Sequence, residues 1–575
     1  MRWLLRKTDP NTVDALSRDA ALSPVIAALL AARGIITPDS AHAFLNPSLD
    51  QLHSPFLMSG LRAAVERLRA AIDRNETIFI YGDYDVDGTT AIVILKTALE
   101  LCGGRVEFHV PHRIREGYGM RDQVIEQAAA AGIRLIISVD TGIRAFAAAD
   151  VASRCGVDLI VTDHHLPQAE AVPRALAVVN PNQPGCEYPC KALCGAGVAF
   201  KITQALLEAT GRLRLLPSFL KMVAIATIAD SVPLIGENRV FTKLGLEGLR
   251  TPRNPGLRAL LALCQLDGSR PLSAGDIAFR VAPRLNAAGR MDLAERVIDL
   301  FSEKDEARAA DMAMRLNDLN GDRQLAEQKI LDQICCQIDT TPAWKNTYSL
   351  VVAGEQWHRG VIGICATRVV ERYHRPALVF SIEDGEAHGS GRSIEALHLL
   401  DALESCADLF TRFGGHAHAV GCSLSADRLP ELRSRLELFA RRHLQPNDLI
   451  PVLDYDSDLP LSDANLRLWH SLVRLEPHGV GNPKPVFVTR GAKLVQPPRI
   501  MKDIHIKLRV ANGDAAAQPP QDVVGWRMAQ RLAESALVMG DTLDLAFTVD
   551  HNTNPDFAGV QLTLADFARP APPSP

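Results

Sequence analysis

Short apolar runs alternate with amphipathic stretches along much of the chain. Five runs rich in β-branched residues are typical of buried strands. Helical patterns such as TAIVILKTALELC separate them. Strands that alternate with helices form parallel sheets, so the pattern predicts an α/β fold with a doubly wound parallel sheet within residues 71–260. The predicted strands lie at 77–81, 106–110, 134–139, 158–162 and 175–180.

The pattern changes on both sides of this region. Residues 1–70 carry helical repeats and are predicted to form a helical extension. A helical connector is predicted over 261–340, with a long spanning helix in the run DEARAADMAMRLNDLNGDRQLAEQKILDQI. A second α/β region is predicted over 341–450, and the recurring short strands of 451–567 predict a small β-barrel. The last residues, 568–575, are expected to be disordered.

Composition places the chain among globular proteins with several domains. It has 575 residues, 47% apolar and 22% charged, with a net charge of −5, so any nucleic-acid surface has to be local. No signal peptide and no apolar run of about 18 residues is seen, so no membrane span is expected. Eleven cysteines without framework spacing suggest reduced thiols and a cytoplasmic location. Cys186, Cys190 and Cys194 could bind zinc, but their spacing favours coincidence.

The stretch Asp83-Tyr84-Asp85-Val86-Asp87-Gly88 resembles the start of a calcium-binding EF-hand loop. Such a loop needs a glutamate at its twelfth position, which here is Ile94. It also needs a helix before it, whereas residues 77–81 predict a strand. A solvated acidic turn is a further alternative, but three alternating carboxylates directly after a buried strand favour a functional site.

Other acidic and histidine residues follow other apolar runs of the same region. Asp140 follows 134–139, Asp163-His164-His165 follows 158–162, and Asp230 follows the run MVAIATIA. Ligands of parallel sheets bind beyond the carboxyl ends of the strands. Clustered carboxylates repel one another without cations, and Asp oxygens with one His nitrogen suit Mn²⁺ or Mg²⁺. A pair of such ions would support phosphoryl hydrolysis.

Adjacent residues at a strand end point in opposite directions, so only one of His164 and His165 is expected to be a ligand. The other would touch a phosphate or donate a proton. Its alternative role is to hold a neighbouring loop. The sequence contains no Walker motif, so it gives no sign that ATP is used.

GDYDVDGTTA, VDTGI and TDHH together resemble the DHH phosphoesterase superfamily. VPHRIREGYGM, FRVAPRLNAAGRMDLAERVIDLF, FGGHAHAVGCSL and LEPHGVGNPKPVF narrow the resemblance to the RecJ family of bacterial exonucleases. It covers nearly the whole chain after about residue 45. In the superfamily's DxDxxG pattern Asp83 and Asp85 are the matched pair, so Asp87 ranks below them as a candidate metal ligand. The implied metal ligands are Asp83, Asp85, Asp140, His164 and Asp230, with Asp140 bridging two ions, Asp163 behind them and His165 near the scissile phosphate.

The second α/β region resembles the DHH-associated domain, DHHA1. Gly389-Ser390-Gly391-Arg392-Ser393 is predicted to be a loop whose N–H groups, hydroxyls and guanidinium cradle a phosphate, with Gly414-Gly415-His416 as a second loop. The alternative is that these glycines only make tight turns. The candidates for binding a 5′-terminal phosphate are Arg280, His358, Ser390, Gly391, Arg392, Gly415 and His416.

The C-terminal barrel resembles an OB-fold. Between Phe487 and Arg531 there are eight Lys or Arg against three Asp, which suits a groove that follows a phosphate backbone. The three acids are Asp503, Asp514 and Asp522. The candidate DNA contacts are Lys502, Lys507, Arg509 and Trp526. Trp526 or His505 would stack on a base; the alternative places Trp526 in the barrel core.

The resemblance implies a Mn²⁺- or Mg²⁺-dependent exonuclease that degrades single-stranded DNA from the 5′ end and releases 5′-mononucleotides, in DNA repair and recombination. It also implies a monomer, with single-strand-binding protein and a RecQ-type helicase as partners. One alternative is a DHH-type phosphodiesterase for oligoribonucleotides or cyclic dinucleotides, but such chains are shorter and lack the barrel. Another is a non-catalytic single-strand-binding replication factor, but such relatives have lost metal ligands that are present here.

Overall fold

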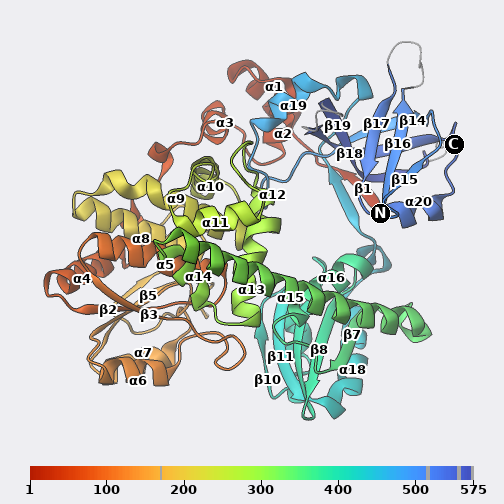
Figure 1. The fold of residues 1–575 in the computed structure, drawn as a ribbon. Coiled ribbons are helices and arrows are strands. Elements are labelled where there is room, and N and C mark those ends of the chain that lie inside the picture. The colour runs from red at the N-terminus through yellow and green to blue at the C-terminus, as the bar shows by residue number, and fades with distance from the viewer. Residues whose placement is uncertain (169–170, 513–518, 553–558, 571–575) are drawn as a thin grey trace. The chain divides into compact units, whose positions relative to one another are not determined.

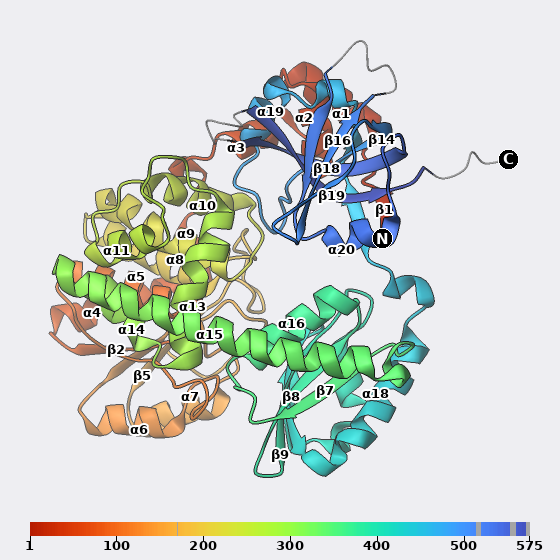
Figure 2. The ribbon, with the colours of Figure 1, turned by 45° about the vertical axis from the view of Figure 1, so that its right-hand side comes forward.

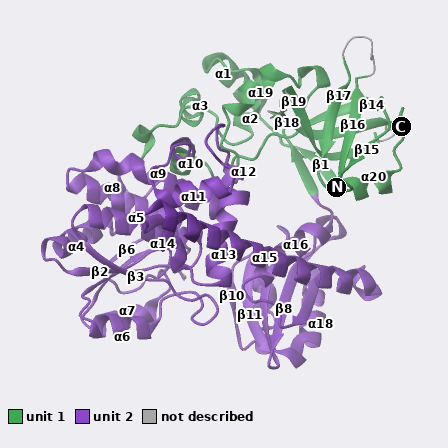
Figure 3. Cartoon of the chain, viewed as in Figure 1, with its two compact units in different colours: residues 1–52, 233–243, 452–575 green, residues 53–232, 244–451 purple. Residues whose placement is uncertain are grey.

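The computed structural model describes residues 1–168, 171–512, 519–552 and 559–570. The chain forms two compact units, each built from segments that are distant in sequence (Figure 3). Unit 1 contains Met1–Leu52, Pro233–Lys243 and Val452–Pro575, and unit 2 contains His53–Val232 and Leu244–Pro451. Of the predicted disordered tail, residues 571–575 lie outside the described part of the chain.

Unit 2 begins with the parallel sheet that the sequence predicts. Its five strands have the order β3-β2-β4-β5-β6 and all pair in parallel. Ile78, Ile80 and Ile136 are buried, as expected for a sheet covered by helices on both faces. The strands are β2 (Thr77–Tyr81), β3 (Arg105–His109), β4 (Leu135–Ser138), β5 (Asp158–Thr162) and β6 (Ala177–Val179).

Helices α6 and α7 cover one face of this sheet, while α4, α5 and α8 lie on the other (Figure 1). The doubly wound arrangement is therefore confirmed. These helices are α4 (Leu61–Asp73), α5 (Val86–Leu101), α6 (Asp122–Ala130), α7 (Phe146–Arg154) and α8 (Gly195–Ala209).

The predicted long helix is α15 (Glu306–Thr340), which has 35 residues and begins at the N-cap Asp305. Its first half buries Ala309, Ala313 and Leu316 and packs on α11 and α13. Its second half buries Ile330, Ile334 and Ile338 in the core of the second α/β region, so one helix joins both parts of unit 2 (Figure 2). The helices before it are α9 (Leu220–Ala229), α10 (Gly236–Gly248), α11 (Pro255–Leu263), α12 (Ala274–Asp276), the π-helix η4 (Ile277–Val281), α13 (Ala282–Met291) and α14 (Glu295–Ser302).

The second α/β region contains a five-stranded mixed sheet of order β10-β11-β9-β8-β7, in which β7 and β8 pair in parallel. Its other pairs are antiparallel. The strands are β7 (Leu350–Glu355), β8 (Ala377–Glu383), β9 (Glu386–Arg392), β10 (Arg412–Gly415) and β11 (Ala419–Ser425), and the helices are α16 (Ile362–Tyr373), α17 (Leu399–Glu404) and α18 (Leu429–His443).

The prediction that 389–393 forms a flexible loop is wrong, because residues 389–392 belong to β9 and their backbone pairs with β8 and β11. The glycines serve packing. A Cβ on Gly389 would lie 2.2 Å from the Phe380 ring, and one on Gly391 would lie 2.4 Å from Leu378. Strand alternation then places Ser390 and Arg392 on the opposite face. Gly414 and Gly415 likewise end a strand, β10.

Unit 1 combines the barrel with the N-terminal segment. The prediction of helices alone for this segment missed β1 (Arg2–Leu5), which pairs in parallel with β12 (Val452–Tyr455). Leu16, Leu29 and Leu30 share one core with Phe487 and Phe547 of the barrel. The N-terminal helices are α1 (Pro10–Asp19), α2 (Pro24–Ala31) and α3 (Pro38–Leu45).

The predicted β-barrel is confirmed. Its strands have the order β13-β14-β18-β19-β17-β16-β15, and an added β14–β16 pairing closes the sheet. No helix of the described residues is both long and apolar enough to span a membrane. The elements are β13 (Ser457–Asp458), α19 (Leu466–Val473), β14 (Phe487–Leu494), β15 (Arg499–Met501), β16 (His505–Ala511), β17 (Gln521–Gly525), α20 (Ala529–Ser535), β18 (Thr542–Asn552) and β19 (Gly559–Ala568).

The packing role of Gly389 predicts a loss of stability on adding one methyl group. We expect Gly389→Ala to lower the free energy of unfolding by about 1–3 kcal/mol, because Phe380 has to move. Urea unfolding measures this, with Gly421→Ala on the neighbouring strand as control, since a Cβ there meets nothing within 4 Å. Equal stability of the two variants would contradict the packing account.

Candidate functional site

The acidic stretch after β2 forms a tight turn from strand into helix. Asp83 is 4% exposed, and the Asp85 side chain caps α5 by accepting the Gly88 N–H at 3.1 Å. Gly88 has to lack a side chain, because a Cβ would lie 2.6 Å from the Asp83 carbonyl oxygen. Ile94 is buried in α5. The calcium-loop hypothesis therefore fails, since a strand precedes the turn and a buried apolar residue occupies the twelfth position.

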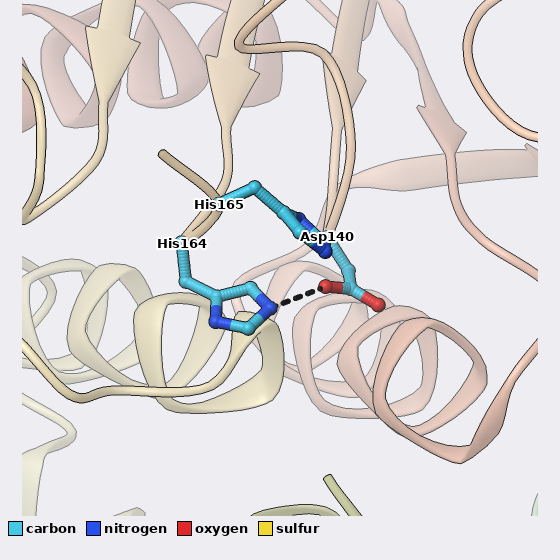
Figure 4. Close-up of side chains that lie close together, drawn as sticks. All are labelled: Asp140, His164 and His165. Carbon is cyan, nitrogen blue, oxygen red and sulfur yellow. Dashed lines mark ion pairs between the residues drawn. The ribbon is translucent and has the colours of Figure 1, made fainter. Parts of the chain in front are cut away.

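Asp140 is the second residue after the end of β4, and its side chain faces His164 (Figure 4). His164 Nε2 is 3.2 Å from Asp140 Oδ1. The Asp140 backbone adopts a left-handed conformation with φ of 59°, which is uncommon outside glycine and costs on the order of 1–3 kcal/mol. Such strain at a buried carboxylate is typical of functional sites.

The structure brings all the predicted metal ligands together in unit 2. Three groups each have ligand atoms within 4.8 Å of one another. Asp140 belongs to two of them, which suits a bridging carboxylate. The groups are Asp83 with Asp85 and Asp140, Asp140 with His164 and His165, and Asp87 with His164 and Asp230.

The donor atoms fit divalent cations. Asp83 Oδ1 and Asp140 Oδ1 are buried and have no hydrogen-bond partner. Burial and neighbouring carboxylates raise the pKa of Asp83, Asp140 and Asp230 well above the usual range. A bound cation would satisfy these oxygens and offset their repulsion.

Asp163 is fully buried and holds the two histidines rather than facing the carboxylate cluster. It accepts the N–H groups of Ile143 at 2.9 Å, His164 at 2.7 Å and His165 at 3.1 Å. The His165 ring also donates from Nδ1 to Asp163 at 2.7 Å. Burial lowers the pKa of His165, but this bond and nearby carboxylates raise it overall. This shift favours the protonated form of His165.

Two expectations about the geometry are wrong. His164 and His165 do not point in opposite directions, because they lie beyond Thr162, the last residue of β5, where strand alternation no longer applies. Their ring centroids are 4.4 Å apart, and each ring has a nitrogen within 4.8 Å of an Asp140 carboxylate oxygen. Asp230 does not follow a strand: it is the C-cap of helix α9. The run MVAIATIA is helical, and it is almost wholly apolar because Val223–Ile228 are all buried.

A cavity of about 560 Å³ in unit 2 brings residues near the cluster together with the second sheet. Arg113, Arg359 and Arg412 line it, and the Arg113 guanidinium lies 4.0 Å from the centre of the Tyr84 ring. Tyr118 also lines it, with its hydroxyl 3.3 Å from His165 Nδ1. Sequence reasoning missed these residues, although the quoted stretch VPHRIREGYGM contains two of them; nothing in that stretch indicates which basic residue faces the cavity.

Only some of the predicted phosphate-binding residues reach this cavity. Ser390 and Gly415 line it, and Arg392 Nη1 lies 3.3 Å from Ser390 Oγ. Gly391 is packed in the core of the sheet, and the exposed His416 bonds through its N–H to the Ala419 carbonyl oxygen at 2.9 Å.

The remaining two predicted phosphate ligands are not among the residues that line this cavity. His358 Nδ1 accepts the Gly360 N–H at 3.1 Å, and the ring lines another cavity beside Glu355 and Glu383. The Arg280 guanidinium is bonded to the Cys264 carbonyl oxygen and lies 3.3 Å from Asp276.

The barrel residues of unit 1 divide into paired and exposed groups. Lys507 and Arg509 share Asp522, at 2.8 Å and 3.4 Å, which reduces their free charge. Trp526 is 52% exposed and meets the His505 ring edge-on, so the alternative that it fills the core is wrong. Lys502 lies in the turn between β15 and β16 with a φ of 49°. Asp514 lies outside the described residues.

Cys186, Cys190 and Cys194 do not form a metal-binding group among the described residues. Cys194 instead precedes α8, where its thiol lies 3.7 Å from the Thr227 hydroxyl. Burial raises the pKa of Cys194 well above its usual range, which keeps the thiol neutral.

Three family models match the chain. Residues 77–227 match the DHH family N-terminal domain, 346–442 match the DHHA1 domain, and 455–566 match the RecJ OB domain. These matches cover both α/β regions and the barrel.

The chain is also similar to whole proteins. It is 36% identical over 567 residues to a single-stranded-DNA-specific exonuclease RecJ of Dickeya dadantii, covering 94% of this chain and 96% of that one. It is 36% identical to the Bacillus subtilis protein of the same name, covering 99% of this chain and 71% of that one. The crystal structure of Thermus thermophilus RecJ in complex with Mn²⁺ superposes with a TM-score of 0.85 at 28% identity, covering 99% of this chain and 80% of that one.

The raised pKa of Asp140 predicts how pH affects the metal-free protein. Ionising Asp140 destabilises the fold, and this loss grows as pH rises from about 4 through the raised folded-state pKa. We therefore expect metal-free Asp140→Asn to unfold at a higher temperature than the parent at about pH 8, with a smaller difference near pH 5.

Thermal unfolding with and without chelator measures this effect. Mn²⁺ at about 100 times its Kd stabilises the parent by about 2.7 kcal/mol, and we expect a smaller gain for the variant. A metal-free variant that is less stable than the parent at the higher pH would contradict the repulsion on which this account rests.

Proposed function

The chain belongs to the RecJ family of single-stranded-DNA-specific exonucleases, and we propose that it hydrolyses single-stranded DNA from the 5′ end and releases 5′-mononucleotides. The observation that carries this proposal is the buried cluster of carboxylates, two of whose oxygens accept no hydrogen bond, in the same unit as an arginine-lined cavity. The cluster supports phosphodiester hydrolysis, and the cavity supports recognition of a terminal phosphate. DNA repair and recombination are the processes in which we propose it acts.

We propose that Asp83, Asp85, Asp140, His164 and Asp230 hold two Mn²⁺ or Mg²⁺ ions, with Asp140 shared between them. Such ions supply an activated water and neutralise charge on the leaving oxygen. The proposed ligands would hold the ions in a buried site, where these effects would be stronger than in open solvent.

His165 supplies a proton-bearing group beside the ligands. Its Nδ1 is engaged by Asp163, so Nε2 is the nitrogen that can face a phosphate oxygen. Against the effect of burial, the hydrogen bond to Asp163 raises the pKa of His165, which favours the protonated ring in which both nitrogens are donors. We propose that it donates a hydrogen bond to the scissile phosphate and stabilises the developing negative charge.

The arginine-lined cavity is the proposed site of the 5′-terminal phosphate. Guanidinium groups bind phosphate oxygens through paired N–H donors, and Ser390 adds a hydroxyl donor. Binding the 5′-terminal phosphate while the next phosphodiester is cut would explain why degradation starts at a strand end and runs in one direction. Arg113, Arg359, Arg412 and Ser390 are therefore the proposed contacts, with Arg392 beneath Ser390.

The barrel is proposed to bind the strand beyond the catalytic unit. The exposed Trp526 offers a stacking surface, and Lys502 lies in a turn of the same barrel. Lys507 and Arg509 are weaker candidates for contacts with DNA phosphates, because Asp522 already pairs with both.

Several further proposals rest on family membership. They are a monomeric enzyme, a cytoplasmic location, and single-strand-binding protein and a RecQ-type helicase as partners. The non-catalytic alternative is disfavoured by the complete ligand set, and the oligoribonucleotide or cyclic dinucleotide alternative by the RecJ OB domain.

The proposed polarity predicts the order in which labelled ends are lost. With Mn²⁺ and single strands, we expect a 5′ label to appear first as a mononucleotide, while duplex DNA is cut far more slowly. Asp140→Ala removes the shared ligand, and we expect activity to fall by about 10²–10³-fold, as when one electrostatic group of an active site is lost. Early loss of a 3′ label, or an active variant, would refute the proposal.

The phosphate cavity predicts a dependence on the chemistry of the end. We expect Arg113→Gln to lose about 1.5–3 kcal/mol of binding to a 5′-phosphorylated strand, the range for a charged hydrogen bond. Competition between 5′-phosphate and 5′-hydroxyl strands measures it. Arg115→Gln, in the same loop but outside this cavity, is the control. An unchanged preference for the phosphorylated end in the Arg113 variant would rule out this cavity as the end-binding site.

A further inference from the structure

Asp87 is a buried acidic residue that the five proposed ligands leave without a role. It lies on the first turn of α5, two residues after Asp85, and is 2% exposed. Both of its carboxylate oxygens face the start of α8. The Gly195 N–H donates to Oδ2 at 2.5 Å, and the Ala196 N–H donates to Oδ1 at 2.8 Å. A carboxylate at a helix N-terminus is a favourable partner for such free N–H groups, so Asp87 joins α5 to α8.

The turn of α8 that Asp87 holds lies directly against Asp140. A Cβ on Gly195 would lie 2.5 Å from the Asp140 Cβ and 2.6 Å from its Oδ1. Only the bare α-carbon of Gly195 leaves room for the Asp140 side chain. Because the left-handed Asp140 backbone is not its preferred conformation, the surrounding structure has to hold it in place. The first turn of α8 is one wall of that surrounding structure.

We infer that Asp87 is a positioning residue, which fixes the Asp140 carboxylate through the first turn of α8 and so sets the affinity of the metal site. The inference rests on the proposed function in one respect, that this cluster binds metal. Asp87 differs from the ligands in its hydrogen bonding. Both its oxygens accept N–H groups, whereas Asp83 and Asp140 each have a buried oxygen without a hydrogen-bond partner, and the Asp140 oxygen faces the His164 ring.

A direct ligand role is the competing explanation. Asp87 Oδ2 lies 3.7 Å from His164 Nε2, and Asp87 groups with His164 and Asp230. Gly195 has no side chain and cannot be a side-chain ligand, so Gly195→Ala tests the contact between α8 and Asp140 apart from any ligand role of Asp87. If positioning is correct, displacing Asp140 from the α8 side weakens metal binding with every carboxylate still present.

The test is a calorimetric titration of the full chain with Mn²⁺, without nucleic acid. We expect Asp87→Ala and Gly195→Ala each to weaken Mn²⁺ binding roughly 10–100-fold, the usual effect of losing a group that orients a ligand. Gly197→Ala, in the same helix, is the matched control. Its Cβ would make an ordinary contact at 3.4 Å with Leu193, so the affinity should equal that of the parent.

Hydrogen exchange of the metal-free protein supplies a second readout. We expect residues 194–199 to exchange faster in Asp87→Ala, because the acceptor for two N–H groups of α8 is gone. A merely structural role would change this exchange but leave the Mn²⁺ affinity alone.

Three outcomes would overturn the inference. Folded Asp87→Ala could bind Mn²⁺ like the parent. It could lose affinity without a change in exchange at 194–199, while Gly195→Ala binds normally, which would make Asp87 a ligand. If Asp87→Ala does not fold, normal Mn²⁺ binding by Gly195→Ala overturns the inference by itself. A parent protein that binds no Mn²⁺ would instead contradict the proposed function.

Discussion

The site depends on the repulsion among carboxylates that share a buried space. Burial is the largest cause that raises the pKa of Asp83, Asp140 and Asp230, and the neighbouring carboxylates raise it further. A fold tolerates such a cluster when surrounding elements hold each side chain and a cation offsets the charge. The parallel sheet provides this support, because two of its strands and the adjoining helices deliver the residues to one edge.

Each acidic or histidine residue of the region has a distinct support. Asp85 caps α5, Asp163 accepts four donors and aligns both histidines, and Asp87 ties α5 to α8. Asp83 and Asp140 each have a buried oxygen that accepts no hydrogen bond, and these are the oxygens that the network leaves for a cation. The same unit contains the arginine-lined cavity, so a charge cluster suited to hydrolysis and a positive site suited to a phosphate end belong to one compact body.

Sequence reasoning succeeded where periodicity and motif spacing are local. The five parallel strands, the helix α15 and the barrel were predicted, since each has a clear apolar pattern. Three kinds of error had physical causes. An apolar run before Asp230 is buried on all sides, so periodicity could not separate helix from strand. Glycines at 389 and 391 were interpreted as loop residues, although a neighbouring ring and leucine require their small size. Asp87 ranked low as a ligand because the DxDxxG pattern matches Asp83 and Asp85. Its own partners are backbone N–H groups more than 100 residues away, which no sequence pattern reveals.

The central claim is that this cluster holds two metal ions bridged by Asp140. The most direct measurement is the anomalous scattering of crystals grown with Mn²⁺. The account predicts two peaks about 3.5–4 Å apart, as in two-metal phosphoesterase sites, with Asp140 between them. A single peak, or peaks away from Asp83, Asp140 and His164, would contradict it.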